Sequence, residues 1–256
     1  MLPLQGKVFL SNSITMMWQS RTNLIINNTQ MQKLQKSHVV VFGVGGVGSY
    51  AAECICRSGV GSITLIDGDT ISESNINRQL PALHSTLNLY KTQVLKERFL
   101  DINPNLNIYT IEKMLTPDDV DILFNNNKFS FIIDAIDSLS TKVQISVNAK
   151  KYNIPIICSM GAGGRLDVTK IKITDISKTY NDGLAAAFRK KLKKEGIYKG
   201  IDVVFSTELA NRNSISKLCD ENRNGNGKRI VGSISFLPAI FGCTMAGYAI
   251  NKLINY

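Results

Sequence analysis

A glycine-rich segment and an acid at a fixed distance from it are the residues of this chain best suited to chemistry. The segment carries four glycines, Gly43, Gly45, Gly46 and Gly48. It lies between the β-branched run 39–42 and a helical pattern at 49–58, and Asp67 follows the apolar run 62–66, 19 residues after Gly48. In such a strand–loop–helix–strand unit the glycines let the backbone approach phosphates at a helix N-terminus, and the acid accepts hydrogen bonds from ribose hydroxyls. The spacing therefore predicts a nucleotide site.

Polar and cationic side chains crowd the segment that follows Asp67. The nucleotide-binding residues expected among them are Asp69, Asn75, Asn77, Arg78, Gln79 and Lys91. The forked guanidinium of Arg78 suits phosphate oxygens, and the ammonium of Lys91 adds a compact positive charge, so both are predicted to act catalytically on a departing pyrophosphate. A nicotinamide-dependent dehydrogenase shares the glycine pattern but has little use for this cationic cluster. We therefore expect ATP, not NAD, as the bound nucleotide.

Two further acids follow the apolar run 131–133, in the segment Asp134-Ala135-Ile136-Asp137-Ser138. Ligands of open parallel sheets bind at the carboxyl ends of the strands. Mg²⁺ is commonly held by one or two carboxylates together with phosphate oxygens and water. Asp137 is predicted to be the metal ligand and a catalytic residue, with Ser138 beside the nucleotide. Asp134 is the candidate for a structural role at the strand end.

Composition places the chain among ordinary globular proteins and bounds its environment. Of 256 residues, 44% are hydrophobic and 20% charged. No uninterrupted apolar run reaches membrane-spanning length, and 234–250 is expected to form a buried strand followed by a helix, so no stable membrane association is predicted. The five cysteines contain no Cys-x-x-Cys pair, which disfavours a zinc ribbon and favours a reducing, cytoplasmic location.

Positive charge is concentrated in the second part of the chain. Residues 1–150 carry a net charge of +1, and residues 151–256 carry +9. A basic helix is expected at 188–194, with Arg189, Lys190, Lys191, Lys193 and Lys194. This clustering predicts an anionic partner, although a solvated amphipathic face explains the helix about as well.

Alternating strand and helix patterns predict an α/β fold, a doubly wound and mainly parallel sheet. We expect a Rossmann-like, ATP-binding adenylating half at 21–160. Residues 161–256 are expected to form the mixed, substrate-binding C-terminal half of the same domain. Residues 1–20 form an N-terminal extension whose order the sequence leaves open.

Taken together, these motifs resemble the adenylating domain of the ubiquitin-activating and sulfur-carrier-activating superfamily. The resemblance rests on the glycine segment, Asp67-Gly68-Asp69, the stretch 74–79, Lys91 and Asp134–Asp137. It implies that Gly46 and Lys91 contact ATP phosphates, that Asp67 holds the ribose and that Asp137 serves Mg²⁺. It further implies a homodimer in which an N-terminal arginine, here Arg21, reaches into the partner's nucleotide site.

The second half resembles one branch of this superfamily, the tRNA threonylcarbamoyladenosine dehydratases. The similarity runs from about Arg21 to Leu253 and includes 159–167, 175–185 and 203–208. Where that family has Asp-Pro-Leu-Ala, this chain has Asp182-Gly183-Leu184-Ala185, which is expected to loosen the local turn.

This resemblance implies ATP-dependent cyclisation of threonylcarbamoyladenosine beside the anticodon of tRNA, with loss of water. The threonine carboxylate is adenylated, and an intramolecular heteroatom then displaces AMP, so no catalytic thiol is needed. Cys219, in a polar stretch, is the one cysteine that could be an exposed nucleophile, although an incidental thiol explains it better. A monovalent cation (K⁺ or Na⁺) and sulfur-transfer accessory proteins are left open. The alternatives are an adenylating activator of a sulfur-carrier or ubiquitin-like protein C-terminus, and a non-catalytic nucleotide-binding scaffold.

Overall fold

The computed structural model describes residues 17–219 and 229–255, without the side chains of 217–219 and 229. Its main sheet has the strand order β3-β2-β1-β4-β5-β7-β6, and a separate hairpin pairs β8 with β9. The strands are β1 (His38–Phe42), β2 (Ser62–Ile66), β3 (Asn107–Ile111), β4 (Phe131–Asp134), β5 (Ile156–Ser159), β6 (Ile171–Asp175), β7 (Asp202–Ser206), β8 (Ile215–Cys219) and β9 (Arg229–Val231). All neighbours in the main sheet pair in parallel except β6, which is antiparallel to β7. The predicted doubly wound, mainly parallel fold is confirmed.

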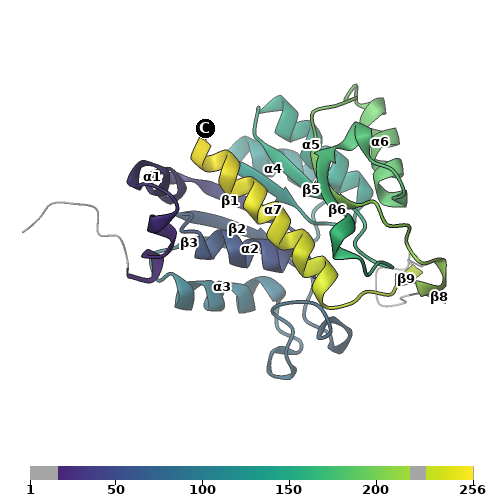
Figure 1. Ribbon diagram of the computed structural model, residues 1–256, viewed down its shortest axis with the longest axis horizontal. Coiled ribbons are helices and arrows are strands. Elements are labelled where there is room, and N and C mark those ends of the chain that lie inside the picture. Colours follow the sequence, from purple (N-terminus) through teal and green to yellow (C-terminus); the bar gives the residue numbers. More distant parts are fainter. Residues whose placement is uncertain (1–16, 220–228, 256) are drawn as a thin grey trace, which may run out of the picture.

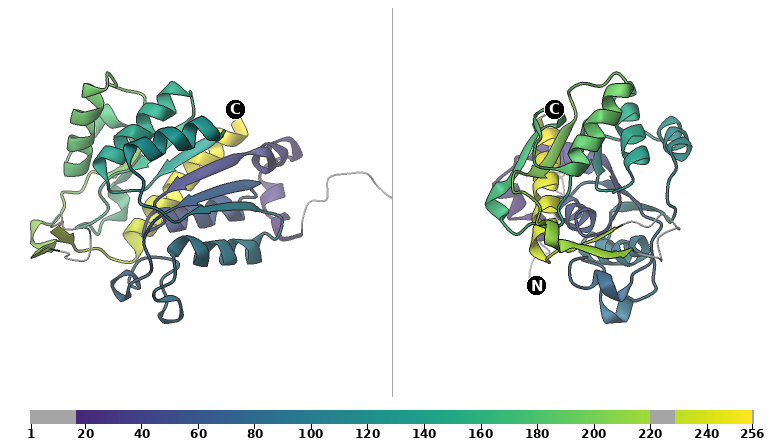
Figure 2. Two further views of the ribbon diagram at one scale, coloured as in Figure 1. Left: turned by 180° about the vertical axis from the view of Figure 1, so that it is seen from behind. Right: turned by 90° about the vertical axis from the view of Figure 1, so that its right-hand side faces the viewer.

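Helices cover both faces of this sheet (Figures 1 and 2). They are α1 (Asn28–Lys36), α2 (Gly48–Arg57), α3 (Lys91–Ile102), α4 (Pro117–Asn126), α5 (Leu139–Lys151), α6 (Gly183–Lys194) and α7 (Phe236–Asn255). Successive side chains of a strand point to opposite faces. In β1, Val39 and Val41 accordingly pack in the core under α1, α2, α3 and α7, whereas Val40 and Phe42 pack in the core under α4, α5 and α6. Burial on both faces explains why this strand reads as a continuous apolar run.

The order of connections creates a switch point between β1 and β4. From β1 the chain proceeds outward through β2 to β3, then returns to β4 on the other side of β1 and proceeds to β5. Helices that follow β1 and β4 therefore leave on opposite faces, and a crevice opens at the carboxyl ends of these strands. We call this end of the parallel strands the carboxyl edge and the opposite end the amino edge.

The C-terminal helix differs from its expected form. Residues 234 and 235 are not in a strand, and α7 runs unbroken through the 20 residues Phe236–Asn255. By length and composition this helix alone, among the described residues, could cross a membrane, although half of its most apolar stretch is buried. It packs most extensively on α2, where Gly242 allows the backbones to meet: a Cβ there would lie 2.3 Å from the Val47 carbonyl oxygen. Core packing thus accounts for much of the apolar character that suggested a strand.

Candidate nucleotide-binding site

The glycine segment turns from β1 into α2 at the switch point, and its four glycines serve two purposes. Gly43 has φ +78°, a left-handed conformation that glycine adopts readily. A Cβ on Gly48 would lie 1.8 Å from the Gly43 carbonyl oxygen, so this position admits only glycine without a backbone shift. Gly45 and Gly46 are more open, because a Cβ on either would be 3.7 Å from Gln79 Nε2 or 3.2 Å from Pro238 Cβ, respectively. The outer pair shapes the turn, and the inner pair leaves backbone accessible to a ligand.

Asp67 ties the loop to the end of β2. Its Oδ2 accepts a 2.8 Å hydrogen bond from the Val44 N–H, and its Oδ1 accepts one of 2.9 Å from the Asp69 N–H. Lys91, the first residue of α3, is almost fully buried, and its Nζ lies 2.8 Å from Asp69 Oδ2 and 3.9 Å from Asp67 Oδ1. The two acids therefore hold the ammonium group beside the glycine loop.

The segment between β2 and α3 brings three amide side chains and an arginine to the same place. Arg78 donates from Nη1 to the Ser74 carbonyl oxygen at 2.8 Å and to Asn77 Oδ1 at 2.7 Å. Its Cγ lies 3.5 Å from the Cβ position of Gly46. Asn77 in turn donates from Nδ2 to the Ser233 carbonyl oxygen at 3.1 Å, which ties this segment to the chain just before α7. The guanidinium is thus oriented by its neighbours next to the open part of the glycine loop.

Asn75 and Gln79 are buried beneath this segment but differ in their partners. Asn75 Oδ1 accepts a hydrogen bond from the Ser72 N–H at 3.2 Å. Gln79 is 6% exposed, and its Oε1 has no hydrogen-bond partner among the described residues. Thr92 Oγ1, next to Lys91, is in the same situation. Buried polar groups in folded proteins are almost always paired. The Gln79 side chain borders the loop, so its unpaired oxygen fits a site that pairs with a polar ligand.

The two acids after β4 have separate roles. Asp134 is completely buried, and its Oδ2 lies 2.8 Å from Nζ of the equally buried Lys142. Burial raises the pKa of Asp134, and the Lys142 ammonium opposes that rise. Asp137 is exposed three residues further on, and Ser138 is the N-cap residue of α5. The buried ion pair fits the structural role predicted for Asp134 at the end of β4. Asp137, in contrast, faces solvent at the carboxyl edge.

The residues predicted to bind the nucleotide meet at the carboxyl edge, with Arg21 as the exception. Gln19, two residues before Arg21, approaches Gly59, which lies between the end of α2 and the start of β2. Arg21 thus belongs to the amino edge, at the opposite end of the strands from its own glycine loop. It can serve a nucleotide only in another copy of the chain.

The four cysteines whose side chains are described do not form a reactive centre near this site. Burial raises the pKa of Cys54 and of Cys56 to about 12, and raises that of Cys158 well above its usual value. Cys219 is not the only candidate for an exposed thiol, because Cys243 is exposed on α7, with its Sγ 3.7 Å from Cys54 Sγ. Cys243 lies at the border of the α2–α7 contact, where one side of the helix meets solvent. The side chain of Cys219 and residues 220–228, predicted to be a crossover loop, lie outside the described part.

The second half adds a buried arginine beside the same edge. Arg165 donates to the carbonyl oxygens of Asn181 and Glu208 at 2.9 Å, and its Nη2 lies 3.3 Å from Asp182 Oδ2. Asp182 also accepts from the Gly161 N–H at 3.0 Å and caps α6 through the Ala185 N–H at 2.8 Å. The Gly183 that replaces the family proline begins α6 with this cap intact. The expected loosening of this turn stays a prediction.

Sequence reasoning missed several residues that shape the site. Lys142, Thr92, Ser233 and Pro238 are brought to it by tertiary packing. Lys142 follows Asp134 by eight residues, but only the β4–α5 turn brings the two together. For Ser233 and Pro238 the sequence holds no local signal, because their partners lie more than 150 residues away.

Comparisons with known proteins agree with this geometry. The ThiF family profile matches residues 19–256, and the chain belongs to the ThiF family. Within that family it is 39% identical to the tRNA threonylcarbamoyladenosine dehydratase of Bacillus subtilis, over 92% of this chain and 94% of the relative. It is 35% identical to the Escherichia coli protein of the same name, over 93% and 94%. The crystal structure of the E. coli dehydratase in complex with ATP superposes with a TM-score of 0.80 at 34% identity, over 92% of this chain and 93% of that one.

Proposed function

We propose that this protein is an ATP-dependent tRNA threonylcarbamoyladenosine dehydratase. The observation that carries the proposal is similarity over nearly the full length of relatives with that name, together with a glycine loop, Asp67, Arg78 and Lys91 gathered at one crevice. The E. coli relative, which shares this fold, forms a crystalline complex with ATP.

In the proposed reaction the threonine carboxylate of the modified adenosine attacks the α-phosphate of ATP. A P–O bond forms to the carboxylate, and the bond to pyrophosphate breaks. A heteroatom of the carbamoyl group then attacks the activated carbonyl carbon, and AMP leaves with the carboxylate oxygen. The net change in the RNA is the loss of one water and closure of a ring. Because the second nucleophile belongs to the substrate, proximity supplies much of that step.

The chain's own residues would act on charge and position. Gly45 and Gly46 leave room for the phosphates. Asp67, which now accepts a hydrogen bond from the Val44 N–H, would accept hydrogen bonds from the ribose hydroxyls instead. Arg78 and Lys91 would stabilise the negative charge that builds on the leaving pyrophosphate. Asp69 holds the Lys91 ammonium in place.

Asp137 would hold Mg²⁺ together with phosphate oxygens. Among the described residues no three acids, histidines or cysteines cluster as a metal cage. One exposed carboxylate at the phosphate side fits Mg²⁺, which is often bound by one or two carboxylates and the nucleotide itself. Bound there, the ion would offset phosphate charge in the transition state. A monovalent cation stays an open prediction.

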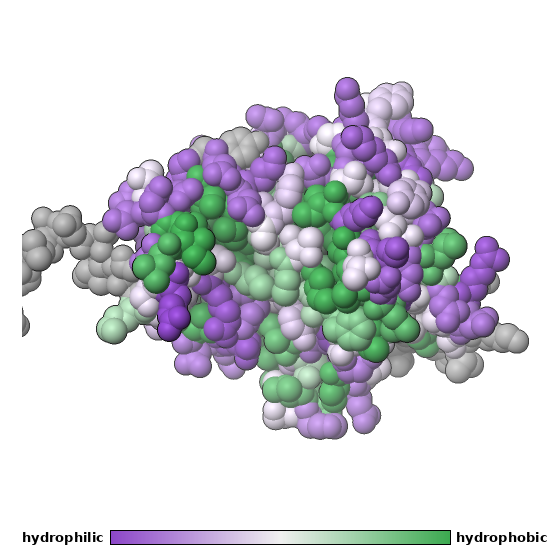
Figure 3. Space-filling view, in the orientation of Figure 1, coloured by the Kyte–Doolittle hydropathy of each residue, from purple (hydrophilic) through white to green (hydrophobic). Residues whose placement is uncertain are grey.

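We infer a homodimer, which the position of Arg21 and exposed apolar side chains support. Arg21 lies at the amino edge and needs a second copy to reach a nucleotide. Figure 3 shows hydrophobic patches separated by hydrophilic residues, and the region over α6 is hydrophilic. Exposed apolar side chains are Leu166 and Val168 before β6, Ile173 in β6 and Phe236 at the start of α7. A cytoplasmic location follows from the free thiols and the tRNA substrate.

The rival activity is adenylation of a sulfur-carrier protein. The molybdopterin-synthase adenylyltransferase of Haemophilus influenzae is 30% identical, but over 63% of this chain. The decisive experiment incubates the protein with ATP, Mg²⁺ and tRNA carrying threonylcarbamoyladenosine, followed by digestion and mass spectrometry. The modified nucleoside should lose the mass of one water. An unchanged nucleoside, with ATP consumed only when a carrier protein with a Gly-Gly tail is added, would favour the rival.

A further inference from the structure

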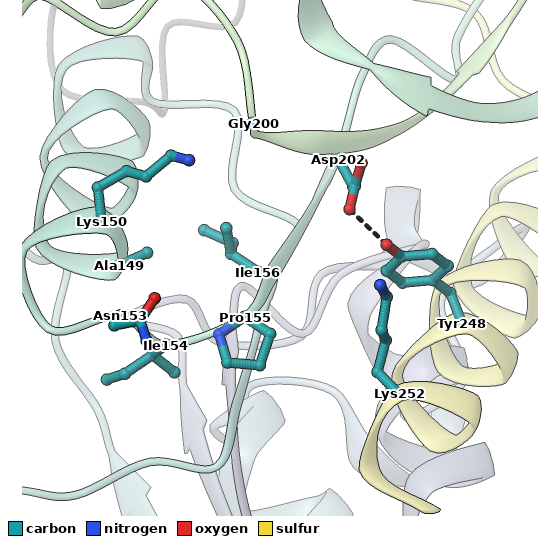
Figure 4. A pocket seen from close by; sticks show the side chains of 10 residues that line it. All are labelled: Ala149, Lys150, Asn153, Ile154, Pro155, Ile156, Gly200, Asp202, Tyr248 and Lys252. Atoms are coloured by element: carbon teal, nitrogen blue, oxygen red, sulfur yellow. Dashed lines mark hydrogen bonds between the residues drawn. The ribbon is translucent and has the colours of Figure 1, made fainter. Parts of the chain in front are cut away.

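Two adjoining hollows lie at the amino edge, far from the nucleotide site. One, of about 230 Å³, lies between the end of α5, the start of β7 and the last turns of α7 (Figure 4). The other, of about 490 Å³, lies between the end of α1, the start of β4 and the same part of α7. Both are lined by 153–155 and by Lys252, so the two hollows adjoin along these residues. We call the two hollows together the amino-edge groove.

Lysines from three helices line this groove. They are Lys33 and Lys36 at the end of α1, Lys150 at the end of α5 and Lys252 near the end of α7. Figure 4 shows Lys150 and Lys252 extending toward the first hollow from opposite walls. In the described part of the chain, no hydrogen bond or ion pair engages the side-chain ammonium of Lys36 or of Lys150, and both residues are exposed.

Lysines are favoured near helix C-termini, where the helix dipole is negative. We therefore compare the charge of these lysines with the opposing charge of the helix ends. The groove receives the C-terminal ends of α1, α5 and α7, each equivalent to about half a negative charge. Among the described residues that line either hollow, Asp202 is the one carboxylate, and the Tyr248 hydroxyl donates to it. The positive charge of the four lysines exceeds the combined negative charge of the three helix ends and Asp202 by more than one unit. The surplus leaves the groove electropositive and able to hold an external anion.

The shape and the remaining lining identify the kind of anion. The smaller hollow is below the roughly 300–1,000 Å³ of most small-molecule sites, and the larger one falls within that range. Because the lysines are spread over both hollows, a chain with repeated charges can engage more of them than one small ligand can. Tyr152 lines the larger hollow, but its ring is stacked on Phe124 and the Lys151 ammonium lies over it, 5.0 Å from the ring centroid. The ring is therefore already engaged, and the lysines are the groups that remain for the anion.

We infer that the amino-edge groove binds the phosphodiester backbone of RNA through its lysines. That the bound RNA is the substrate tRNA rests on the proposed function. Binding of RNA in the groove does not itself require catalysis. Since the strands separate the groove from the nucleotide site, the groove contributes to holding RNA and not to the chemical step.

The test is the double variant Lys36→Gln/Lys150→Gln, with Lys96→Gln/Lys172→Gln, which line neither hollow, as a control of equal charge. Filter binding of tRNA is measured against salt concentration. Each phosphate that a lysine no longer neutralises flattens the log–log slope by about 0.7–0.9, so the slope of the groove variant should fall by about 1.4–1.8 and that of the control should not change. Both variants should keep the parental Kd for ATP. Parental tRNA affinity and slope in the groove variant would overturn the inference.

A parallel measurement separates RNA from free nucleotides as the source of the phosphate. Equilibrium dialysis with AMP counts binding sites in the parent and in the groove variant. An unchanged AMP count alongside weakened tRNA binding supports the inference. A lost AMP site with unchanged tRNA binding overturns it in favour of a mononucleotide site. If groove-dependent tRNA binding persists but no water is lost from the modified nucleoside, the proposed function fails and the groove stands.

Discussion

The two edges of the sheet both carry positive charge, but they hold it differently. At the carboxyl edge Lys91 is buried against Asp69, and Arg78 is oriented by Ser74 and Asn77. At the amino edge Lys36 and Lys150 are exposed around an open groove. A fixed cation can stabilise charge that develops at one point, because it needs no reorganisation when the reaction occurs. Mobile surface cations serve a partner whose charges are spread along a chain.

This contrast assigns catalysis to the carboxyl edge and RNA binding to the exposed lysines, and substitutions can test each assignment. Changes at the carboxyl edge should act on turnover. Changes among the exposed lysines should act on RNA affinity and its dependence on salt. A substitution that moved both quantities equally would weaken the distinction.

The largest effects are expected from Arg78→Ala and Asp137→Ala. Loss of one preorganised charge-stabilising group costs about 10²–10³ in rate. Each variant should lose that much adenylation activity, measured as pyrophosphate exchange into ATP, while thermal unfolding stays near that of the parent. Near-parental turnover in either folded variant would refute the role assigned to that residue.

Gly48→Ala should be the next most damaging change, through the backbone. Its methyl group would meet the Gly43 carbonyl oxygen at 1.8 Å, so the start of α2 must shift. Overpacking of this kind costs about 1–3 kcal/mol of stability, and ATP affinity should fall with it. Gly183→Ala is the matched control, because nothing lies within 4 Å of its Cβ position at the start of α6. If calorimetry gave both variants the same ATP affinity, the tight turn would not matter for binding.

The exposed lysines of α6 should affect RNA binding alone. Lys190, Lys191 and Lys194 face solvent, whereas Arg189 is engaged by the Thr179 carbonyl oxygen at 3.0 Å. Replacing the three lysines with Gln should weaken tRNA binding and flatten its salt slope by about 0.7–0.9 for each phosphate that is no longer neutralised. Arg189→Gln should leave the slope unchanged, because that side chain is already committed. Equal slopes in parent and triple variant would make α6 an ordinary solvated face.

The smallest effects are expected at the cysteines. Cys219→Ser and Cys243→Ser should turn over at the parental rate, since the cyclising nucleophile belongs to the substrate. Steady-state kinetics on modified tRNA measures this. Loss of activity in a folded Cys219→Ser protein would indicate a thioester intermediate and a carrier-protein activator instead.

Much of the nucleotide site could be predicted because its signals are local. The glycine spacing, Asp67 and the apolar runs of β1, β2 and β4 lie within short stretches, and strand order brings their carboxyl ends together. The ion pair of Asp134 with Lys142 and the unpaired Gln79 oxygen depend on packing depth, which residue type does not encode.

The amino-edge groove illustrates the limit more sharply. Its lysines come from α1, α5 and α7, separated by more than 100 residues along the chain, and each alone looks like an ordinary charge in the last turn of a helix. Only the sheet, by aligning these helix ends, turns them into one surface. The exposure of Cys243 was hidden for a related reason, since an apolar stretch does not reveal which face of its helix is covered.

The measurement closest to the central claim is pyrophosphate exchange into ATP by the parent protein, with Mg²⁺ and either modified tRNA or a carrier protein ending in Gly-Gly. A carboxylate adenylated at the carboxyl edge makes the first step reversible, so labelled pyrophosphate should enter ATP. We predict exchange with tRNA that carries threonylcarbamoyladenosine, and none with unmodified tRNA or with the carrier protein. Exchange that requires the carrier protein and ignores the modified tRNA would contradict the proposed function.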